Sequence, residues 1–123
     1  IPVDCCFCDL TVESFQHLFF ECWYTKELWI GMLKWLGYNI QVMAWDSEVQ
    51  WINSKARSRK AVNEVLCCSF ALVVNQVWRA RNQKRFQNRP YKLEENLKEL
   101  KLFICLKAWK LAKWKEVLQG LKI

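Results

Sequence analysis

Residues 5–22 read CCFCDLTVESFQHLFFEC and place three cysteines and the only histidine of the chain at the spacing C-x2-C-x8-H-x4-C. Two cysteines separated by two residues can direct both sulfurs at one ion from a tight turn, and a later histidine and cysteine can complete a tetrahedron. Three thiolates and one imidazole suit Zn²⁺ and leave no open position for an activated water. The stretch therefore predicts a structural zinc knuckle with Cys5, Cys8, His17 and Cys22 as ligands.

Cys6 leaves the identity of the first ligand open. Cys6 and Cys8 form a C-x-C pair that could bind a metal less regularly, whereas Cys5 and Cys8 form the commoner C-x2-C pair. The spacing favours Cys5, and both assignments stand at this point. Buried or disulfide-bonded cysteines are the competing interpretation of an isolated C-x2-C pair, and the histidine and cysteine downstream argue against it.

The same residues resemble a known family. The run CCFC, the pair Glu13 and Ser14, the segment HLFFEC and then Trp29 follow the order C-P-x-C, E-S, H-L-F-x-x-C and W. That order is found in the zinc-binding domain that follows the reverse transcriptase in plant non-LTR (LINE-type) retroelements. Cys6 stands where that family often has proline, and the stretch that normally precedes the knuckle is not in this sequence.

A second segment extends the resemblance. Residues 77–86 read VWRARNQKRF, which is similar to the I-W-x-x-R-N-x-x-x-F segment found after the knuckle in those polyproteins. The two segments together cover roughly residues 5–92. The resemblance implies an accessory role beside a reverse transcriptase, in a nuclear or ribonucleoprotein setting.

Composition predicts a helical fold. Three Gly and two Pro in 123 residues are too few for a many-turned β-sandwich, and the length suits one domain. Because 53% of the residues are hydrophobic and eight are Trp, we expect an aromatic-rich core or a surface meant for a partner. The expected fold is a single all-α domain with an N-terminal structural zinc knuckle, a long central core helix and a long amphipathic C-terminal helix.

The first half of the domain is predicted to have two parts. Residues 1–40 comprise the knuckle, in which Ser14 can cap a short helix that carries the histidine, and a second helix over residues 23–36. Gly37 is the natural residue after the end of that helix. Residues 41–57 comprise a connector and a short helix.

The second half is predicted to consist of two long helices. Residues 58–89 form the central helix, with apolar positions over nearly half of its circumference. Residues 90–123 form an amphipathic helix whose apolar positions follow a 4-3 spacing, with Lys107 in one position of the seam. Pro90 suits the first turn of that helix. Two adjacent apolar stripes are expected on the central helix: Val62, Leu66, Phe70, Val73 and Val77, and Cys67, Ala71, Val74 and Trp78.

Charge is divided unevenly along the chain. Residues 1–54 hold two basic and seven acidic residues, a net charge of −5, whereas residues 55–123 hold seventeen basic and five acidic residues, a net charge of +12. An asymmetry of this size indicates that the second half meets a polyanion or an acidic surface. The candidate nucleic-acid-binding residues follow Trp78, which is expected to be buried beneath them: Arg79, Arg81, Lys84, Arg85, Arg89 and Lys92.

Several catalytic chemistries lack their motifs. The three glycines are isolated, so no phosphate-binding loop is present, and His17 is the only histidine that could serve a catalytic dyad. The paired aspartates that hold two metals in polymerases and ribonuclease H domains are also missing. We therefore expect that the chain is not an enzyme.

Cysteine usage and the apolar runs indicate a location. Seven cysteines, an odd number, and no secretory signal favour reduced thiols in an intracellular protein, and the resemblance favours the nucleus over the cytoplasm. The longest apolar run, residues 65–74, is short of the about 20 residues that span a bilayer, so a membrane partner is not expected.

Two functions follow from these observations. The first is a non-catalytic, retroelement-derived zinc-binding module that binds RNA or DNA through its basic C-terminal half. The alternative is a protein-interaction or self-association module, a domesticated retroelement fragment that acts through its aromatic surface and C-terminal helix. That alternative predicts a homo-oligomer or a complex with a protein partner.

Overall fold

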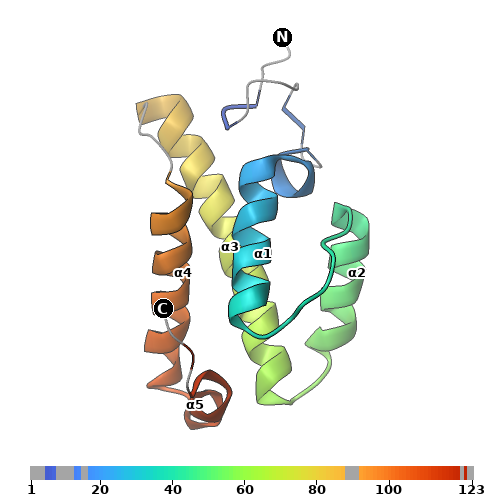
Figure 1. Cartoon of the computed structure of the whole chain (residues 1–123), viewed down its shortest axis with the longest axis vertical. Helices are drawn as coiled ribbons and strands as arrows, with labels where there is room; N and C mark the ends of the chain where they lie inside the picture. The colour runs from blue at the N-terminus through green and yellow to red at the C-terminus, as the bar shows by residue number, and fades with distance from the viewer. Residues whose placement is uncertain (1–4, 8–12, 15–16, 88–91, 120, 122–123) are drawn as a thin grey trace.

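A computed structural model describes residues 5–7, 13–14, 17–87, 92–119 and 121, and over these residues the fold is all-α, as predicted. Six helices follow one another in this part of the chain (Figure 1). They are the π-helical turn η1 (His17–Glu21) and the α-helices α1 (Trp23–Trp35), α2 (Trp45–Ala56), α3 (Ala61–Gln87), α4 (Leu93–Ala108) and α5 (Ala112–Leu118).

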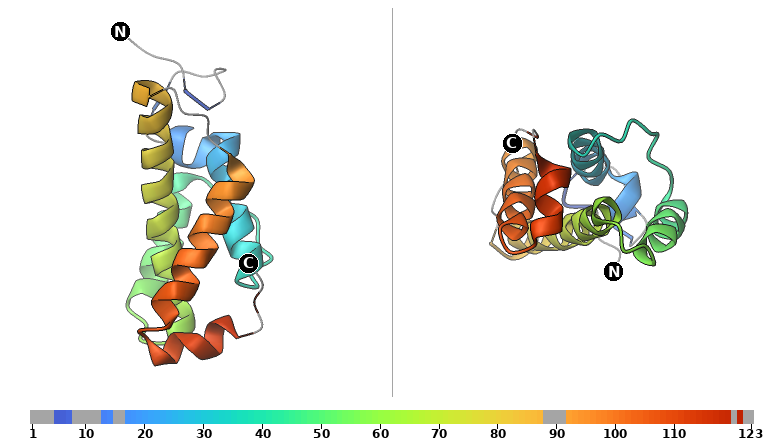
Figure 2. Two further views of the ribbon diagram at one scale, coloured as in Figure 1. Left: turned by 90° about the vertical axis from the view of Figure 1, so that its left-hand side faces the viewer. Right: turned by 90° about the horizontal axis from the view of Figure 1, so that it is seen from below.

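The centre of the fold is α3, which contacts each of the other five helices. Seen along its length in Figure 2, α3 lies between α2 on one side and α4 with α5 on the other. The predicted long central helix is confirmed, although it begins at Ala61 instead of residue 58; residues 88 and 89 lie outside the described part. Its buried residues are Val65, Leu66, Ser69, Val73, Gln76, Val77 and Ala80.

The buried face of α3 differs in part from the two predicted stripes. Val62 and Trp78 are 41% and 48% exposed, so the expectation of a buried Trp78 is wrong. Ser69 and Ala80 are buried instead, and the Ser69 hydroxyl donates to the Val65 carbonyl oxygen at 2.8 Å. Prediction from hydrophobicity alone misses small residues such as Ala80. It also misses hydroxyl side chains such as Ser69, which can be buried because they form a hydrogen bond within their own helix.

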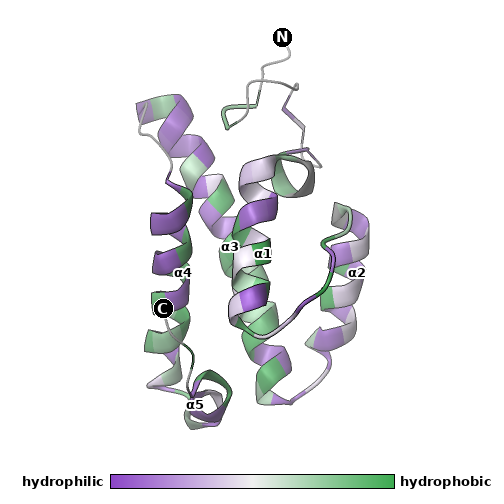
Figure 3. Ribbon diagram, in the orientation of Figure 1, coloured by the Kyte–Doolittle hydropathy of each residue, from purple (hydrophilic) through white to green (hydrophobic). Residues whose placement is uncertain are grey.

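Composition alone would also allow α3 to cross a membrane. Among the described helices it is the one with sufficient length and mean apolarity, and a third of its most apolar window, 33%, is buried. Core helices of soluble proteins meet the same criteria, and the other five helices pack around α3. Figure 3 shows that its hydrophobic turns lie toward the α2–α3 connection and its hydrophilic turns toward the opposite end.

The helix α1 supplies the largest fully buried side chains, including Tyr24, Leu28, Trp29 and Met32. The indole Nε1 of Trp29 donates to Oε1 of Glu48 at 2.7 Å and so joins α1 to α2. Burial of this carboxylate is therefore compensated by a hydrogen bond that fixes the position of α2.

The end of α1 follows the prediction closely. Gly37 has a φ of 95°, the left-handed conformation that favours glycine. The Gly37 amide donates to the Lys34 carbonyl at 3.1 Å, and the Tyr38 amide donates to the Leu33 carbonyl at 2.8 Å. These two hydrogen bonds form a Schellman motif, which ends the helix.

The C-terminal segment contains two helices, and the prediction of one continuous helix is wrong. The helix α4 ends at Ala108, and after a short turn α5 packs against α3 and α4 (Figures 1 and 2). Trp114 of α5 is only 3% exposed, and its Nε1 donates to Oε1 of Glu64 in the first turn of α3 at 3.3 Å. The turn places Trp114 against α3. The 4-3 spacing of apolar residues continues through the turn, because α4 and α5 both bury the residues that follow this spacing, so the sequence pattern alone does not reveal where α4 ends.

Candidate metal centre

Three side chains of the metal-ligating type converge before and at the start of α1. The thiols of Cys5 and Cys22 and the imidazole of His17 are buried, and their ligand atoms all lie within 4.8 Å of one another. The two sulfurs are 3.7 Å apart. A tetrahedral site with metal–sulfur bonds of about 2.3 Å places two sulfurs about 3.8 Å apart. The separation matches the edge of such a tetrahedron, and the group could hold a metal ion.

The π-helical turn η1 positions His17 and Cys22 together. The Cys22 amide donates to the His17 carbonyl at 2.7 Å, a hydrogen bond across five residues that defines a π-helical turn. On an α-helix, residues five apart would be separated by about 140° around the axis. The wider π-helical turn brings His17 and Cys22 back to one side. This geometry explains the spacing of four residues between the two ligands, and the sequence did not predict it.

The start of this turn agrees with the prediction. The Ser14 side-chain oxygen accepts a hydrogen bond from the His17 amide at 3.1 Å, and its carbonyl accepts one from the Leu18 amide at 2.9 Å. Ser14 is therefore the N-terminal cap of the turn that carries His17.

The geometry favours Cys5 over Cys6 as the first ligand. The Cys5 side chain is fully buried and its sulfur lies beside that of Cys22, whereas Cys6 is not part of the converging group. Burial, together with the neighbouring Cys5 thiol, raises the pKa of Cys6 to about 11. Cys8, the predicted fourth ligand, lies outside the described residues.

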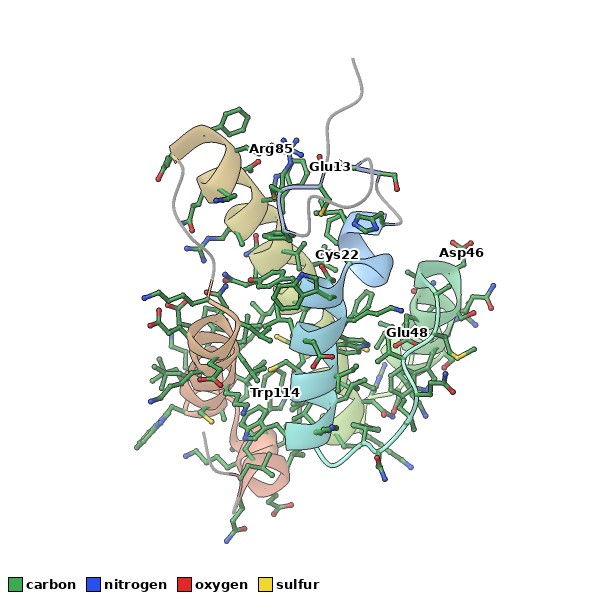
Figure 4. The ribbon with its side chains drawn as sticks, turned by 45° about the horizontal axis from the view of Figure 1, so that its top comes forward. Glu13, Cys22, Asp46, Glu48, Arg85 and Trp114 are labelled. Carbon is green, nitrogen blue, oxygen red and sulfur yellow. The ribbon has the colours of Figure 1, made fainter. Side chains whose placement is uncertain are left out.

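An ion-paired cluster joins Glu13, which lies between Cys5 and His17 in the sequence, to α3. Oε1 of Glu13 accepts hydrogen bonds from Nη2 of Arg81 at 3.0 Å, and Oε2 accepts from Nη2 of Arg85 at 2.7 Å. Each arginine also donates its Nε to the same oxygen, at 3.2 and 3.1 Å. Figure 4 shows Glu13 and Arg85 side by side, at the end of the molecule where Cys22 begins α1.

This ion-paired cluster is partly shielded from water. The side chains of Glu13, Arg81 and Arg85 are 13%, 18% and 21% exposed. Burial is the largest influence on Glu13 and opposes its ionisation, but the hydrogen bonds and charges of the two arginines outweigh it and lower the pKa of the carboxyl. The same hydrogen bonds raise the pKa of Arg85.

The predicted nucleic-acid-binding residues therefore do not form one free cluster. Arg81 and Arg85 hold the carboxylate of Glu13. Of the other predicted residues, Arg79 and Lys92 are exposed, Lys84 is partly buried, and Arg89 lies outside the described residues.

The connection between α2 and α3 carries another basic group, which is not among the predicted nucleic-acid-binding residues. Arg57, Arg59 and Lys60 are exposed, and none of them forms an ion pair with a residue that the structure describes. They lie between the C-terminus of α2, whose C-cap is Arg57, and the first residue of α3. The signal in the sequence was their adjacency, ahead of a helix whose own first turn holds only one acidic residue, Glu64.

No protein-family model matches this chain, and no curated protein or solved structure matches it either. The resemblance to the retroelement domain therefore rests only on the sequence motifs at residues 5–29 and 77–86. Three of these residues, Cys5, His17 and Cys22, lie together in the structure.

Proposed function

We propose that the chain is a non-catalytic zinc-binding module of the kind that follows the reverse transcriptase in plant non-LTR retroelements, and that it binds RNA or DNA through its basic half. The observation that carries the proposal is the convergence of Cys5, His17 and Cys22, with 3.7 Å between the two sulfurs. Cys8 is the proposed fourth ligand.

Zinc is the proposed ion because of the donor set. Thiolates and imidazole suit Zn²⁺, and four protein ligands leave no position for a reactive water, so the ion would be structural. It would join residues 5–8 to η1 and α1 and supply folding free energy to a segment with little core of its own. His17, the only histidine, would be a ligand and unavailable as a catalytic base.

Phosphate contacts are proposed for basic residues that are exposed, lack an acidic partner in the described part of the chain and adjoin one another in the sequence. Arg57, Arg59 and Lys60 meet these three conditions. Lysine and arginine that neutralise phosphates release condensed counterions, so the logarithm of the affinity falls with that of the salt concentration by about 0.7 to 0.9 per phosphate. A nuclear or ribonucleoprotein setting follows from the resemblance.

The test compares two triple variants of the zinc-loaded protein. Arg57→Gln, Arg59→Gln and Lys60→Gln together should weaken binding to a random single- or double-stranded oligonucleotide and reduce the salt slope by about two to three. The control removes three positive charges elsewhere, by Lys26→Gln, Lys34→Gln and Lys98→Gln, and should keep the wild-type slope. Fluorescence anisotropy at several salt concentrations measures both.

Two results would overturn this proposal. One is the absence of binding by the wild type at about 50 mM salt, where counterion release favours binding most strongly. The other is an equal loss of affinity in the two triple variants, which would mean that only net charge matters.

A second candidate function is self-association. It is favoured by four large apolar side chains that are exposed on the last turns of α4 and just after it. They are Leu102 (47%), Phe103 (51%), Leu106 (56%) and Trp109 (77%). An exposed apolar cluster of this kind marks an interaction surface.

A further inference from the structure

The exposed face of α4 has an apolar half and a charged half. Leu100, Ile104 and Ala108 form the buried face, which packs against the rest of the bundle. Figure 3 shows α4 hydrophilic over its first turns and hydrophobic over its last turns. The exposed surface therefore changes along the helix from a charged region, which includes Glu95 and Glu99, to the apolar cluster.

Four exposed residues form a straight row on this face. Glu99, Phe103, Leu106 and Lys110 recur at a 4-3-4 spacing, and the first three lie within a wedge of about 60° on a helix of 3.6 residues per turn. Lys110 follows the end of α4 in a tighter turn, in which its amide donates to the Lys107 carbonyl at 3.1 Å. Because Trp109 keeps helical dihedral angles, φ −60° and ψ −30°, this turn extends the helix by about one residue beyond its C-cap. Phe103, Leu106 and Lys110 also line a groove of about 370 Å³.

The row on one copy of the chain is complementary to the same row on a second copy that runs in the opposite direction. A second copy that runs antiparallel, related by a two-fold axis midway between Phe103 and Leu106, places Phe103 opposite Leu106 of the other copy. The same axis places Glu99 opposite Lys110. Neither of these two charged residues forms an ion pair with any residue that the structure describes.

We propose that two copies of the chain form a dimer through this row, with α4 packed antiparallel against α4, Phe103 and Leu106 buried between them and Glu99 paired with Lys110 at each end. The proposal rests on the second candidate function and does not require nucleic-acid binding. A polyanion or an anionic lipid surface suits the row less well, because Glu99 lies within it and would be repelled.

The size of the contact sets its strength. A single pair of short helices buries less than the about 1,200 Å² of a standard interface, so dissociation in the micromolar range is expected. Two ion pairs, one at each end, would select the antiparallel register by disfavouring a parallel arrangement of like charges.

Charge reversal tests the pairing. Glu99→Lys alone and Lys110→Glu alone should each raise the dimer dissociation constant about tenfold, since each creates two like-charge contacts per dimer. The double variant restores opposite charges and should return to within about threefold of wild type. Controls of the same charge change outside the row, Glu27→Lys and Lys34→Glu on α1, should leave the constant unchanged.

Sedimentation equilibrium of the zinc-loaded chain, from about 1 to 200 μM to span the expected range, measures the dissociation constant. Far-UV circular dichroism and zinc content verify that each variant keeps its fold. A wild type that stays monomeric throughout overturns the proposal, as does a dimer that the double variant does not restore. A monomer that binds anionic vesicles or oligonucleotide through this row overturns it too.

The dimer and the proposed function can fail separately. Failure of the dimer leaves zinc content and salt-dependent oligonucleotide binding as they were, because the row contains none of the residues proposed to bind zinc or phosphate. A dimer without oligonucleotide binding would retain the second candidate function and remove the first.

Discussion

The carboxylate of Glu13 and the guanidinium of Arg85 lie 2.7 Å apart and join residues separated by 72 positions in the sequence. Arg81, one helical turn earlier, donates to the other oxygen of the same carboxylate. Glu13 lies between the first cysteines and His17, so this cluster fastens the proposed metal-binding segment to the central helix. Two residues predicted to contact nucleic acid therefore have a role inside the fold.

Glu13→Gln should lower the free energy of unfolding by about 1–3 kcal/mol. The variant leaves two partly buried guanidinium groups without a counter-charge, which costs more than the loss of an exposed pair and less than that of a fully buried one. Urea denaturation of the zinc-loaded protein measures the change. Glu27→Gln, an exposed position on α1, is the control and should change stability by less than about 0.5 kcal/mol. An equal effect of the two substitutions would contradict the structural role of Glu13.

The contribution of Glu13 should depend on pH in a defined direction. Because the arginines lower its pKa in the folded protein, the carboxylate stabilises the fold fully above its ordinary value of 4.5, and this contribution is lost as the pH falls through the lower, folded value. The difference in unfolding free energy between wild type and Glu13→Gln should therefore be constant from pH 7 to about 5.5 and shrink below 4.5. Comparing the two proteins at each pH cancels effects that they share, such as metal release. A difference that grows toward acid pH would refute this assignment.

Metal content should distinguish the two neighbouring cysteines. Inductively coupled plasma spectrometry of the purified protein should give one zinc per chain, and Cys5→Ser should lose it whereas Cys6→Ser retains it. His17→Ala and Cys22→Ala should also lose the metal, because each removes a member of the converging group. Chelation should loosen the segment before α1 first, since metal binding supplies its folding free energy. Full retention of zinc in both His17→Ala and Cys22→Ala would disprove the site.

The sequence was informative where the cause of a structure is local. Ser14 and Gly37 act within one turn of the backbone that they cap or end, and the spacing of Cys5, His17 and Cys22 falls within 18 residues. These features depend on neighbours in the sequence, so pattern and residue type suffice to predict them. The choice between Cys5 and Cys6 depends on how the chain folds around Cys22, because both residues fit a plausible spacing.

Long-range pairings account for the features that the sequence did not predict. The contact between Arg81 and Glu13 spans 68 residues, and the one between Trp114 and Glu64 spans 50. Charge pattern identifies a basic cluster but not the acid that neutralises part of it. The 4-3 spacing of apolar residues likewise continues through the turn after α4. The spacing therefore does not indicate that Trp114 packs across the start of α3.

Arg81→Gln combined with Arg85→Gln should separate a structural role from a binding role. The pair should lower the free energy of unfolding by at least as much as Glu13→Gln, because both donors to the partly buried carboxylate are lost. Oligonucleotide affinity, measured at a temperature where the variant stays folded, should fall less than in the triple variant of Arg57, Arg59 and Lys60. Anisotropy titration and urea denaturation together provide the measurement. A large loss of oligonucleotide affinity with an unchanged free energy of unfolding would indicate that Arg81 and Arg85 contact nucleic acid.

Two tryptophans on either side of the turn between α4 and α5 give the last prediction. Trp114 is 3% exposed and hydrogen-bonded to Glu64, whereas Trp109 is 77% exposed. Trp114→Ala removes a large buried side chain and should lower the free energy of unfolding by about 3–5 kcal/mol. Trp109→Ala should change it by less than about 0.5 kcal/mol when measured well below the dimer dissociation constant. Denaturation of both variants at low protein concentration provides the comparison. A cost for Trp114→Ala as small as that for Trp109→Ala would contradict the burial of Trp114 against α3.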